Sequence, residues 1–199
     1  MGRVLGKYLA MHIVVFDLET TGFSPSYNEI IQIAGIRMRE GVILEQETFA
    51  TFVRPVRYIP EHITKLTGIT HAQVQDAPEV VDALMNFSRF AGDATLLAHN
   101  GRRFDMPFIR ESCARHKLSV RPVSFIDSMD LSKKLWGGRS HNLDDVMTRL
   151  GLFADGSRRH DARGDVQILA KAVHRMWSQL GHDFKLCPVD CHTGEIPMA

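Results

Sequence analysis

The sequence is poor in cysteine and has no long hydrophobic run. Its 199 residues include only Cys113, Cys187 and Cys191, and this small, odd number favours a reducing compartment over a disulfide framework. No apolar run approaches the roughly 18 residues that cross a bilayer. Residues 1–10 lack the apolar core and cleavage site of a secretory signal. We therefore expect a cytoplasmic chain with no membrane partner.

The chain also lacks an excess of charge of either sign. It carries 24 Lys and Arg against 23 Asp and Glu, a formal net charge of +1. Proteins that wrap a long stretch of duplex DNA usually show a clear basic excess. The composition therefore argues against an extended nucleic-acid contact and leaves room for a short contact with a strand end.

Hydrophobic patterning predicts an α/β domain. Apolar residues run almost continuously from Ile13 to Phe16, as in a strand buried on both faces. Later strand-like runs begin as a hairpin and then alternate with helical patterns, an order typical of a mixed sheet flanked by helices. We expect five strands at residues 12–16, 30–38, 42–53, 95–98 and 124–126, and helices at residues 60–66, 78–90, 104–114, 142–150 and 166–180.

The same patterns suggest where the domain begins and ends. Met11 stands directly before the first strand-like run, so residues 1–10 are expected to be an N-terminal extension. Residues 11–181 are expected to form the domain, because Gly181 ends the last helical pattern. Residues 182–199 show no periodicity and are expected to form an irregular C-terminal tail.

Two carboxylates alternate with apolar residues at the end of the first strand. Residues i and i+2 of a strand point to the same face, so Asp17 and Glu19 must project together. Two adjacent carboxylates repel each other and lose hydration when buried, which a bound cation would offset. The alternative is a solvated turn at the strand edge.

Further acidic residues stand at the starts of two predicted helices. Asp105 follows a strand and begins a helix, where Asp is also common for purely structural reasons. His160 lies in the loop that leads into the last helix, and Asp165 follows about one turn later. Alone, Asp105 could equally be a helix cap, and a lone His or Asp at the second helix start would most often be a surface residue.

Taken together, these segments resemble a known enzyme family. Asp17-x-Glu19, His99-Asn100 with Phe104-Asp105, and His160-x-Ala162-x-x-Asp165 are similar, in content and order, to the three motifs of DnaQ-like 3′→5′ exonucleases of the DEDDh group. That group includes the proofreading subunit of bacterial DNA polymerase III. The spacing of the second motif also resembles the three-prime repair (TREX-like) branch. The resemblance covers about residues 13–180 and implies a ribonuclease H-like fold with a five-stranded mixed sheet.

The resemblance implies a two-metal phosphodiesterase. Asp17, Glu19, Asp105 and Asp165 would hold two Mg²⁺ or Mn²⁺ ions, which suit hard oxygen ligands. Two such ions about 3.5–4 Å apart serve phosphodiester hydrolysis. His160 would act as the general base, because an imidazole with its ordinary pKa near about 6.5 is largely neutral at physiological pH.

The loop after the first motif resembles the family's site for the 3′ nucleotide. Gly22 would allow the strand end to approach the backbone, and Phe23 would stack beside the terminal base or anchor the loop in the core. His99 and Asn100 would support the substrate or, alternatively, cap the strand end. The substrate-binding residues expected from the resemblance are Thr20, Thr21, Gly22, Phe23, His99 and Asn100.

Other features leave alternatives open. Basic residues near the motifs could form a shallow rim for phosphates, although at least half are expected to be ordinary surface charges. The tail residues match no common zinc module, so loop residues are the favoured interpretation. The basic residues are Arg102, Arg103, Lys133, Lys134, Arg139, Arg158 and Arg159, and the tail residues are His182, Cys187, Cys191 and His192.

The expected activity is therefore removal of nucleoside 5′-monophosphates from the 3′ end of DNA or RNA, most simply of a single strand. A hydrolase of short oligoribonucleotides and a catalytically silent nucleic-acid-binding scaffold are the alternatives. The family also suggests a polymerase partner, and an exposed strand edge could pair two copies as a homodimer.

Overall fold

A six-stranded mixed sheet forms the centre of the fold. In this computed structural model, residues 11–152 and 162–199 are described. The strand order is β3-β2-β1-β4-β5-β6, with β1, β4 and β5 parallel and the two outer sections antiparallel. The strands are β1 (His12–Thr20), β2 (Ile30–Arg39), β3 (Val42–Phe52), β4 (Thr95–Ala98), β5 (Val120–Asp127) and β6 (His192–Pro197).

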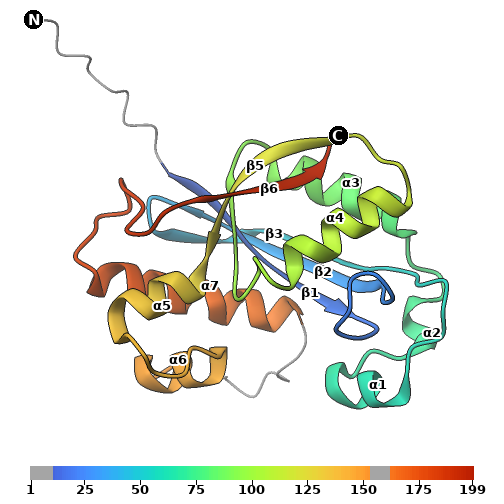
Figure 1. Cartoon of the computed structure of the whole chain (residues 1–199), viewed down its shortest axis with the longest axis horizontal. Coiled ribbons are helices and arrows are strands. Elements are labelled where there is room, and N and C mark those ends of the chain that lie inside the picture. Colours follow the sequence, from blue (N-terminus) through green and yellow to red (C-terminus); the bar gives the residue numbers. More distant parts are fainter. Residues whose placement is uncertain (1–10, 153–161) are drawn as a thin grey trace, which may run out of the picture.

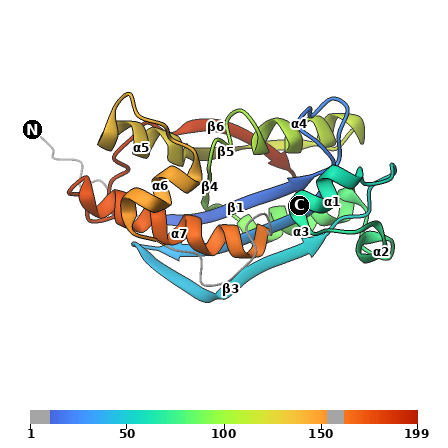
Figure 2. The same cartoon turned by 90° about the horizontal axis from the view of Figure 1, so that it is seen from below.

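Helices cover both faces of this sheet. Figures 1 and 2 both show α5, α6 and α7 grouped together, with α1 and α2 at the opposite end of the molecule. None of the helices within the described residues is both long and apolar enough to cross a membrane. The helices are α1 (Glu61–Thr67), α2 (His71–Val74), α3 (Val80–Ala91), α4 (Asp105–Arg115), α5 (Ser128–Trp136), α6 (Leu143–Leu150) and α7 (Ala162–Gln179).

The alternation of side chains along β1 explains why both faces are covered. Val14 and Phe16 belong to a core cluster that includes residues of α3 and α4. Ile13 and Val15 belong to the other large cluster, with residues of α5, α6 and α7. Successive strand residues point to opposite faces, so a continuous apolar run needs helices on both sides. The predicted α/β class is confirmed, and the sheet has one more strand than expected.

The sixth strand corrects the prediction of an irregular tail. β6 pairs antiparallel with β5, from Val120↔Pro197 to Phe125↔His192. Ile196 is fully buried, and the Ser88 hydroxyl donates to the Pro197 carbonyl at 2.6 Å. Residues His192–Pro197 lack the apolar alternation of a strand, so no local pattern predicts β6. The strand forms because partners far away in the sequence pair with it.

The opposite edge of the sheet is interrupted. Ile36 pairs with Thr48, but its neighbour Arg37 pairs with Leu44. Residues 45–47 therefore bulge out of the ladder between two shorter paired stretches of β3. Bulges of this kind twist an edge strand and break its row of free backbone groups.

Candidate active site

The two carboxylates of the first motif lie at the end of β1. Asp17 pairs with Ala34 and Glu19 with Gln32 of β2, so backbone pairing fixes both positions. Both residues are half-buried, whereas Leu18 between them is buried. The strand therefore presents the two carboxylates on one face, as the sequence spacing predicts.

The start of α7 brings a third carboxylate to the same place. Asp165 lies in the first turn of α7 and is 7% exposed. The backbone N–H of Ala162 donates to the Gln32 side chain at 3.1 Å, which fastens the helix start to β2 beside Glu19. One carboxylate oxygen from each of Asp17, Glu19 and Asp165 lies within 4.8 Å of the other two. Three negatively charged groups this close together repel one another unless a cation joins them.

Asp105 is not one of the three carboxylates that lie within 4.8 Å of one another. It is almost completely buried and lies next to the backbone of Leu18, between the two acids of β1. It is the first residue of α4 and is 1% exposed. Burial, together with the charge of Asp127, raises the pKa of Asp105 to about 7, although its own backbone N–H and that of Leu18 lower it. Its Oδ1 atom has no hydrogen-bond partner among the described residues. A buried oxygen with an unused acceptor fits a cation ligand better than a helix cap.

Asp127 holds the loop that carries the second motif, and sequence analysis missed it. It ends β5, and its carboxylate accepts hydrogen bonds from the backbone N–H groups of Asn100, Arg102 and Met129 at 3.0, 3.1 and 3.0 Å. Asn100 has a left-handed backbone with φ of 59°, which an Asn side chain tolerates better than most. Asp127 thus fixes the turn before Asp105 and also caps α5.

His99 and Asn100 are both half-buried in this turn. The His99 Nδ1 atom and the Ser128 hydroxyl form a hydrogen bond of 2.8 Å. The Asn100 carbonyl accepts from the backbone N–H groups of Arg103 and Phe104, both at 3.0 Å. These contacts give both residues a structural part in the turn, and their expected contact with substrate stays a prediction.

The loop between β1 and β2 is held by its own threonines. The Thr20 hydroxyl donates to the Gly22 carbonyl at 2.6 Å, and the Glu29 N–H donates to the Thr21 hydroxyl at 2.9 Å. A Cβ atom at Gly22 would lie 2.6 Å from the Asn28 side chain, so close packing within the loop explains this glycine. Phe23 is 74% exposed and does not anchor the loop in the core.

The predicted general base lies outside the described residues. His160 belongs to residues 153–161, as do Arg158 and Arg159 of the predicted rim. Arg102 and Arg103 are exposed on the turn before Asp105. Lys133 pairs with Asp130 at 3.3 Å, so this lysine is at least partly engaged within the protein.

Two of the tail residues considered for zinc, Cys187 and His192, lie next to α5. His192 Nε2 and Asp130 Oδ2 are 2.9 Å apart. Cys187 is half-buried and Cys191 is exposed. Burial, and to a smaller extent the neighbouring Cys191 thiol, raise the pKa of Cys187 to about 12. In the described part of the chain, the group with metal-ligand spacing is Asp17, Glu19 and Asp165.

Comparison with known proteins identifies the class. A family model described as an exonuclease of the RNase T type matches residues 14–173, and the chain belongs to this exonuclease family. A DNA polymerase III subunit epsilon-like protein of Rhodobacter capsulatus is 39% identical over 170 residues, or 82% of this chain and 23% of the relative. A PolC-type DNA polymerase III of Latilactobacillus sakei is 30% identical and is matched over 89% of this chain and 12% of its own length. The resemblance to DnaQ-like exonucleases is thereby confirmed.

Solved structures share the fold. Exonuclease X in complex with 5′-overhanging duplex DNA has a TM-score of 0.70 and 24% identity, covering 87% of this chain and 99% of that chain. The nuclease domain of 3′hExo, a DEDDh member bound to rAMP, has a TM-score of 0.71 and 21% identity, covering 85% of this chain and 93% of that chain. These likenesses show the ribonuclease H-like fold. The chain spans less than a quarter of the length of the curated relatives named above.

Proposed function

We propose that this chain hydrolyses phosphodiester bonds at the 3′ end of a DNA strand and releases nucleoside 5′-monophosphates. The observation that carries the proposal is the gathering of Asp17, Glu19 and Asp165, whose carboxylate oxygens lie within 4.8 Å of one another. Membership of the exonuclease family gives this cluster its chemical context.

The residues of this site suit two Mg²⁺ or Mn²⁺ ions. All four proposed ligands, Asp17, Glu19, Asp105 and Asp165, offer hard oxygen atoms, and such donors favour these ions over structural zinc. The unused Oδ1 atom of buried Asp105 supports the assignment, and Asp17 would be among the ligands. Divalent ions held there would activate water and stabilise charge on the leaving oxygen.

His160 is proposed as the general base. In the sequence it stands two residues before the first residue of α7 and five before Asp165, and this spacing supports the proposal. A neutral imidazole would accept the proton of the attacking water, a step that typically contributes about 10²–10⁴-fold to the rate. The carboxylates bind and orient, and the histidine moves the proton.

The substrate is proposed to be DNA because the relatives most similar in sequence are named as DNA polymerase III proteins. The strand end would meet the loop from Thr20 to Phe23, where exposed Phe23 is free to stack on a base. His99 and Asn100 would support the nucleotide from the turn before α4. A polymerase partner is proposed on the same basis as the substrate.

End-labelled single-stranded DNA, duplex DNA and RNA test the proposal directly. With Mg²⁺, the wild-type chain should shorten DNA from its 3′ end one nucleotide at a time, and EDTA should stop the reaction. Asp17→Asn should abolish both cleavage and Mn²⁺ binding measured by calorimetry. Asp93→Asn, the same change at an exposed turn residue, is the matched control and should cleave normally.

Each other outcome points to a different function. Absence of cleavage on every substrate would reject the exonuclease and favour a silent scaffold. Cleavage of only the shortest RNA would favour an oligoribonucleotide hydrolase. Equal cleavage by wild type and Asp17→Asn would reject the assigned metal site even if the activity itself were real.

A further inference from the structure

An exposed aromatic surface lies beside the proposed active site and is not used by it. Tyr27, Val56 and Tyr58 are 71%, 89% and 76% exposed, and we call these three residues the tyrosine ledge. Tyr27 belongs to the same β1–β2 loop as Phe23, and Figure 1 shows this loop between α4 and the segment of α1 and α2. Large side chains this exposed are most informative when they form a contiguous group.

Hydrogen bonds hold the ledge in place. The carboxylate of Glu29 accepts from the backbone N–H groups of Val56 and Arg57 at 3.1 and 3.0 Å. The Arg57 guanidinium donates to the Tyr27 carbonyl at 3.0 Å. The two tyrosines therefore stand on segments that are cross-linked to each other. A surface built in this way loses little conformational entropy when a ligand binds.

One of the two rings is already oriented by a neighbour. The rings of Tyr58 and His71 have centroids 4.7 Å apart and an interplanar angle of 30°. Tyr58 nevertheless remains 76% exposed, so most of its ring surface still faces solvent. A flat ring supported from one side and open on the other is suited to stacking with another flat ring.

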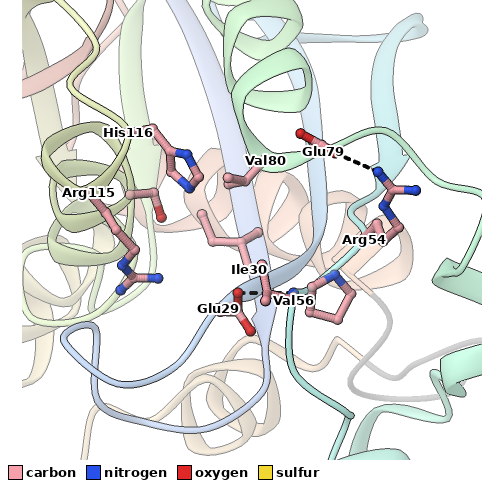
Figure 3. Close-up of a pocket in the computed structure, with 10 residues that line it drawn as sticks. Glu29, Ile30, Arg54, Val56, Glu79, Val80, Arg115 and His116 are labelled. Atoms are coloured by element: carbon pink, nitrogen blue, oxygen red, sulfur yellow. Dashed lines mark hydrogen bonds and ion pairs between the residues drawn. The ribbon is translucent and has the colours of Figure 1, made fainter.

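A cavity of about 140 Å³ borders the ledge at Val56. Figure 3 shows Arg115 and His116, at the end of α4, on one side of this cavity and the ion pair between Arg54 and Glu79 on the other. Ile30 and Val80 contribute apolar surface.

Two arginines near the ledge and its cavity keep guanidinium N–H groups that can donate to a phosphate. Both Glu29 oxygens accept backbone N–H groups, and Glu79 is paired with Arg54 at 2.5 Å. Arg115 uses one guanidinium nitrogen to donate to the Pro25 carbonyl at 2.9 Å, which leaves its other nitrogens able to meet a phosphate. The two acids remain negatively charged but are engaged within the protein, whereas Arg57 and Arg115 each use one guanidinium nitrogen and keep the others for a ligand.

We propose that the tyrosine ledge binds unpaired nucleotides of the substrate outside the catalytic centre, with bases stacked on Tyr27 and Tyr58 and phosphates held by Arg57 and Arg115. Aromatic rings alternating with cationic side chains are the usual way in which proteins hold single strands without reading their sequence. The inference rests on the proposed function, because it assumes that the ligand of the neighbouring site is a nucleic acid. It predicts a preference for substrates with an unpaired segment.

Binding of a fluorescent 20-nucleotide single-stranded DNA, measured by anisotropy in EDTA, tests the ledge without depending on cleavage. Stacking on an aromatic side chain is worth roughly 1–3 kcal/mol per base, so Tyr27→Ala with Tyr58→Ala should weaken binding at least about tenfold. Tyr27→Phe with Tyr58→Phe keeps both rings and should bind like wild type. Leu186→Ala, a change at another exposed apolar side chain, is the matched control.

A second measurement separates this inference from the function on which it rests. The p-nitrophenyl ester of thymidine 5′-monophosphate is too short to reach the ledge, but its hydrolysis needs the catalytic centre. The Ala double variant should hydrolyse this ester like wild type and show a raised KM for the 20-mer. If the wild-type protein did not hydrolyse the ester, the proposed function would be rejected, whereas the inference about the ledge would still be decided by the binding measurement.

Equal DNA binding by the wild type and the Ala double variant would overturn the inference. The ledge would then be a docking surface for a protein partner. Weakened binding by the Phe double variant would also overturn it, because the rings would then not be the groups that bind.

Discussion

Two regions of the molecule differ in how their charges are arranged: the carboxylate end, where Asp17, Glu19, Asp105 and Asp165 lie, and the tail edge, where β6 packs beside β5 and α5. Asp17, Glu19 and Asp165 are gathered within 4.8 Å, and Asp105 is buried with an unused oxygen. At the tail edge, Asp130 faces His192 at 2.9 Å and Lys133 at 3.3 Å. The first region concentrates like charges and the second pairs opposite charges.

This difference separates function from stability. Crowded and desolvated carboxylates destabilise the metal-free fold, a cost that proteins accept where a site must bind a cation. Paired charges and buried apolar groups at the other edge stabilise the sheet. Changes at the carboxylate end should therefore damage activity and spare or improve stability, and changes at the tail edge should do the reverse.

Among changes that measure activity and stability together, the largest expected effect follows replacement of Asp105 by Asn. Loss of a metal ligand should remove several kcal/mol of transition-state stabilisation and lower the turnover by about 10³-fold or more. In EDTA at pH 8 the variant should be more stable than wild type in urea, because burial raises the pKa of Asp105 to about 7 and each pKa unit corresponds to about 1.36 kcal/mol. A variant that loses both activity and stability would break the contrast between the two regions.

Replacement of His160 by Ala should have the next largest effect. Turnover should fall by about 10²–10⁴-fold, as expected for loss of a general base, while calorimetry should show unchanged Mn²⁺ binding. His12→Ala, at the exposed first residue of β1, is the matched histidine control. Unchanged turnover of the His160 variant would reject its assignment.

At the tail edge, replacement of Ile196 by Ala should cost about 2–4 kcal/mol of unfolding free energy. Ile196 is fully buried in the core cluster beside α3 and α4, and removal of its side chain leaves a cavity. The remaining folded protein should keep its activity per molecule. Val120→Ala, at a partly exposed position of the neighbouring strand, should cost much less; equal losses would show that β6 is not packed as described.

The smallest effect is expected from loss of the ion pair between β6 and α5. Burial raises the pKa of Asp130, but the hydrogen bonds from His192 and Lys133 outweigh this and lower it overall. A carboxylate whose pKa is lowered in the folded state stabilises the fold at pH values above its unfolded pKa of about 3.9. This contribution is lost as the pH falls through the folded pKa.

His192→Ala should therefore lower the stability by less than about 1 kcal/mol near pH 6, since partly exposed pairs are weak. The difference from wild type should shrink as the pH falls through the folded pKa of Asp130, which is lowered. Urea unfolding at pH 6 and at decreasing pH values checks this. A difference that persists at low pH would assign the effect of the substitution to packing alone.

The sequence allowed much of the carboxylate end to be predicted, because its pattern is local. The spacing of Asp17 and Glu19 determines that they share a face of β1. The residues around Asp165 predict that it stands at the entrance to the last helix, and α7 begins slightly earlier, at Ala162. The closeness of the three groups depends on strand pairing and on the bond from Ala162 to Gln32, which no local pattern contains.

The tail edge escaped prediction for the same reason. β6 contains a glycine and ends with a proline, both weak strand formers, and forms because β5 and the Ser88 hydroxyl are available to it. The helix α5 was missed, although Asp127 caps it, because its few apolar residues follow directly after a strand. Asp127 has no local sequence signature, because its role depends on the backbone N–H groups of three residues that the fold brings to its carboxylate.

The interruption of β3 has a consequence for behaviour at high concentration. An unbroken eleven-residue edge would be a template on which further copies could add strand by strand, the first step of fibre growth. Here three residues, two of them acidic, leave the ladder between Leu44 and Thr48. Each remaining stretch is short. Glu47 pairs with Arg37 at 3.5 Å, while exposed Glu45 presents its charge to a second edge. The bulge therefore favours colloidal stability and works against self-assembly through this side of the sheet.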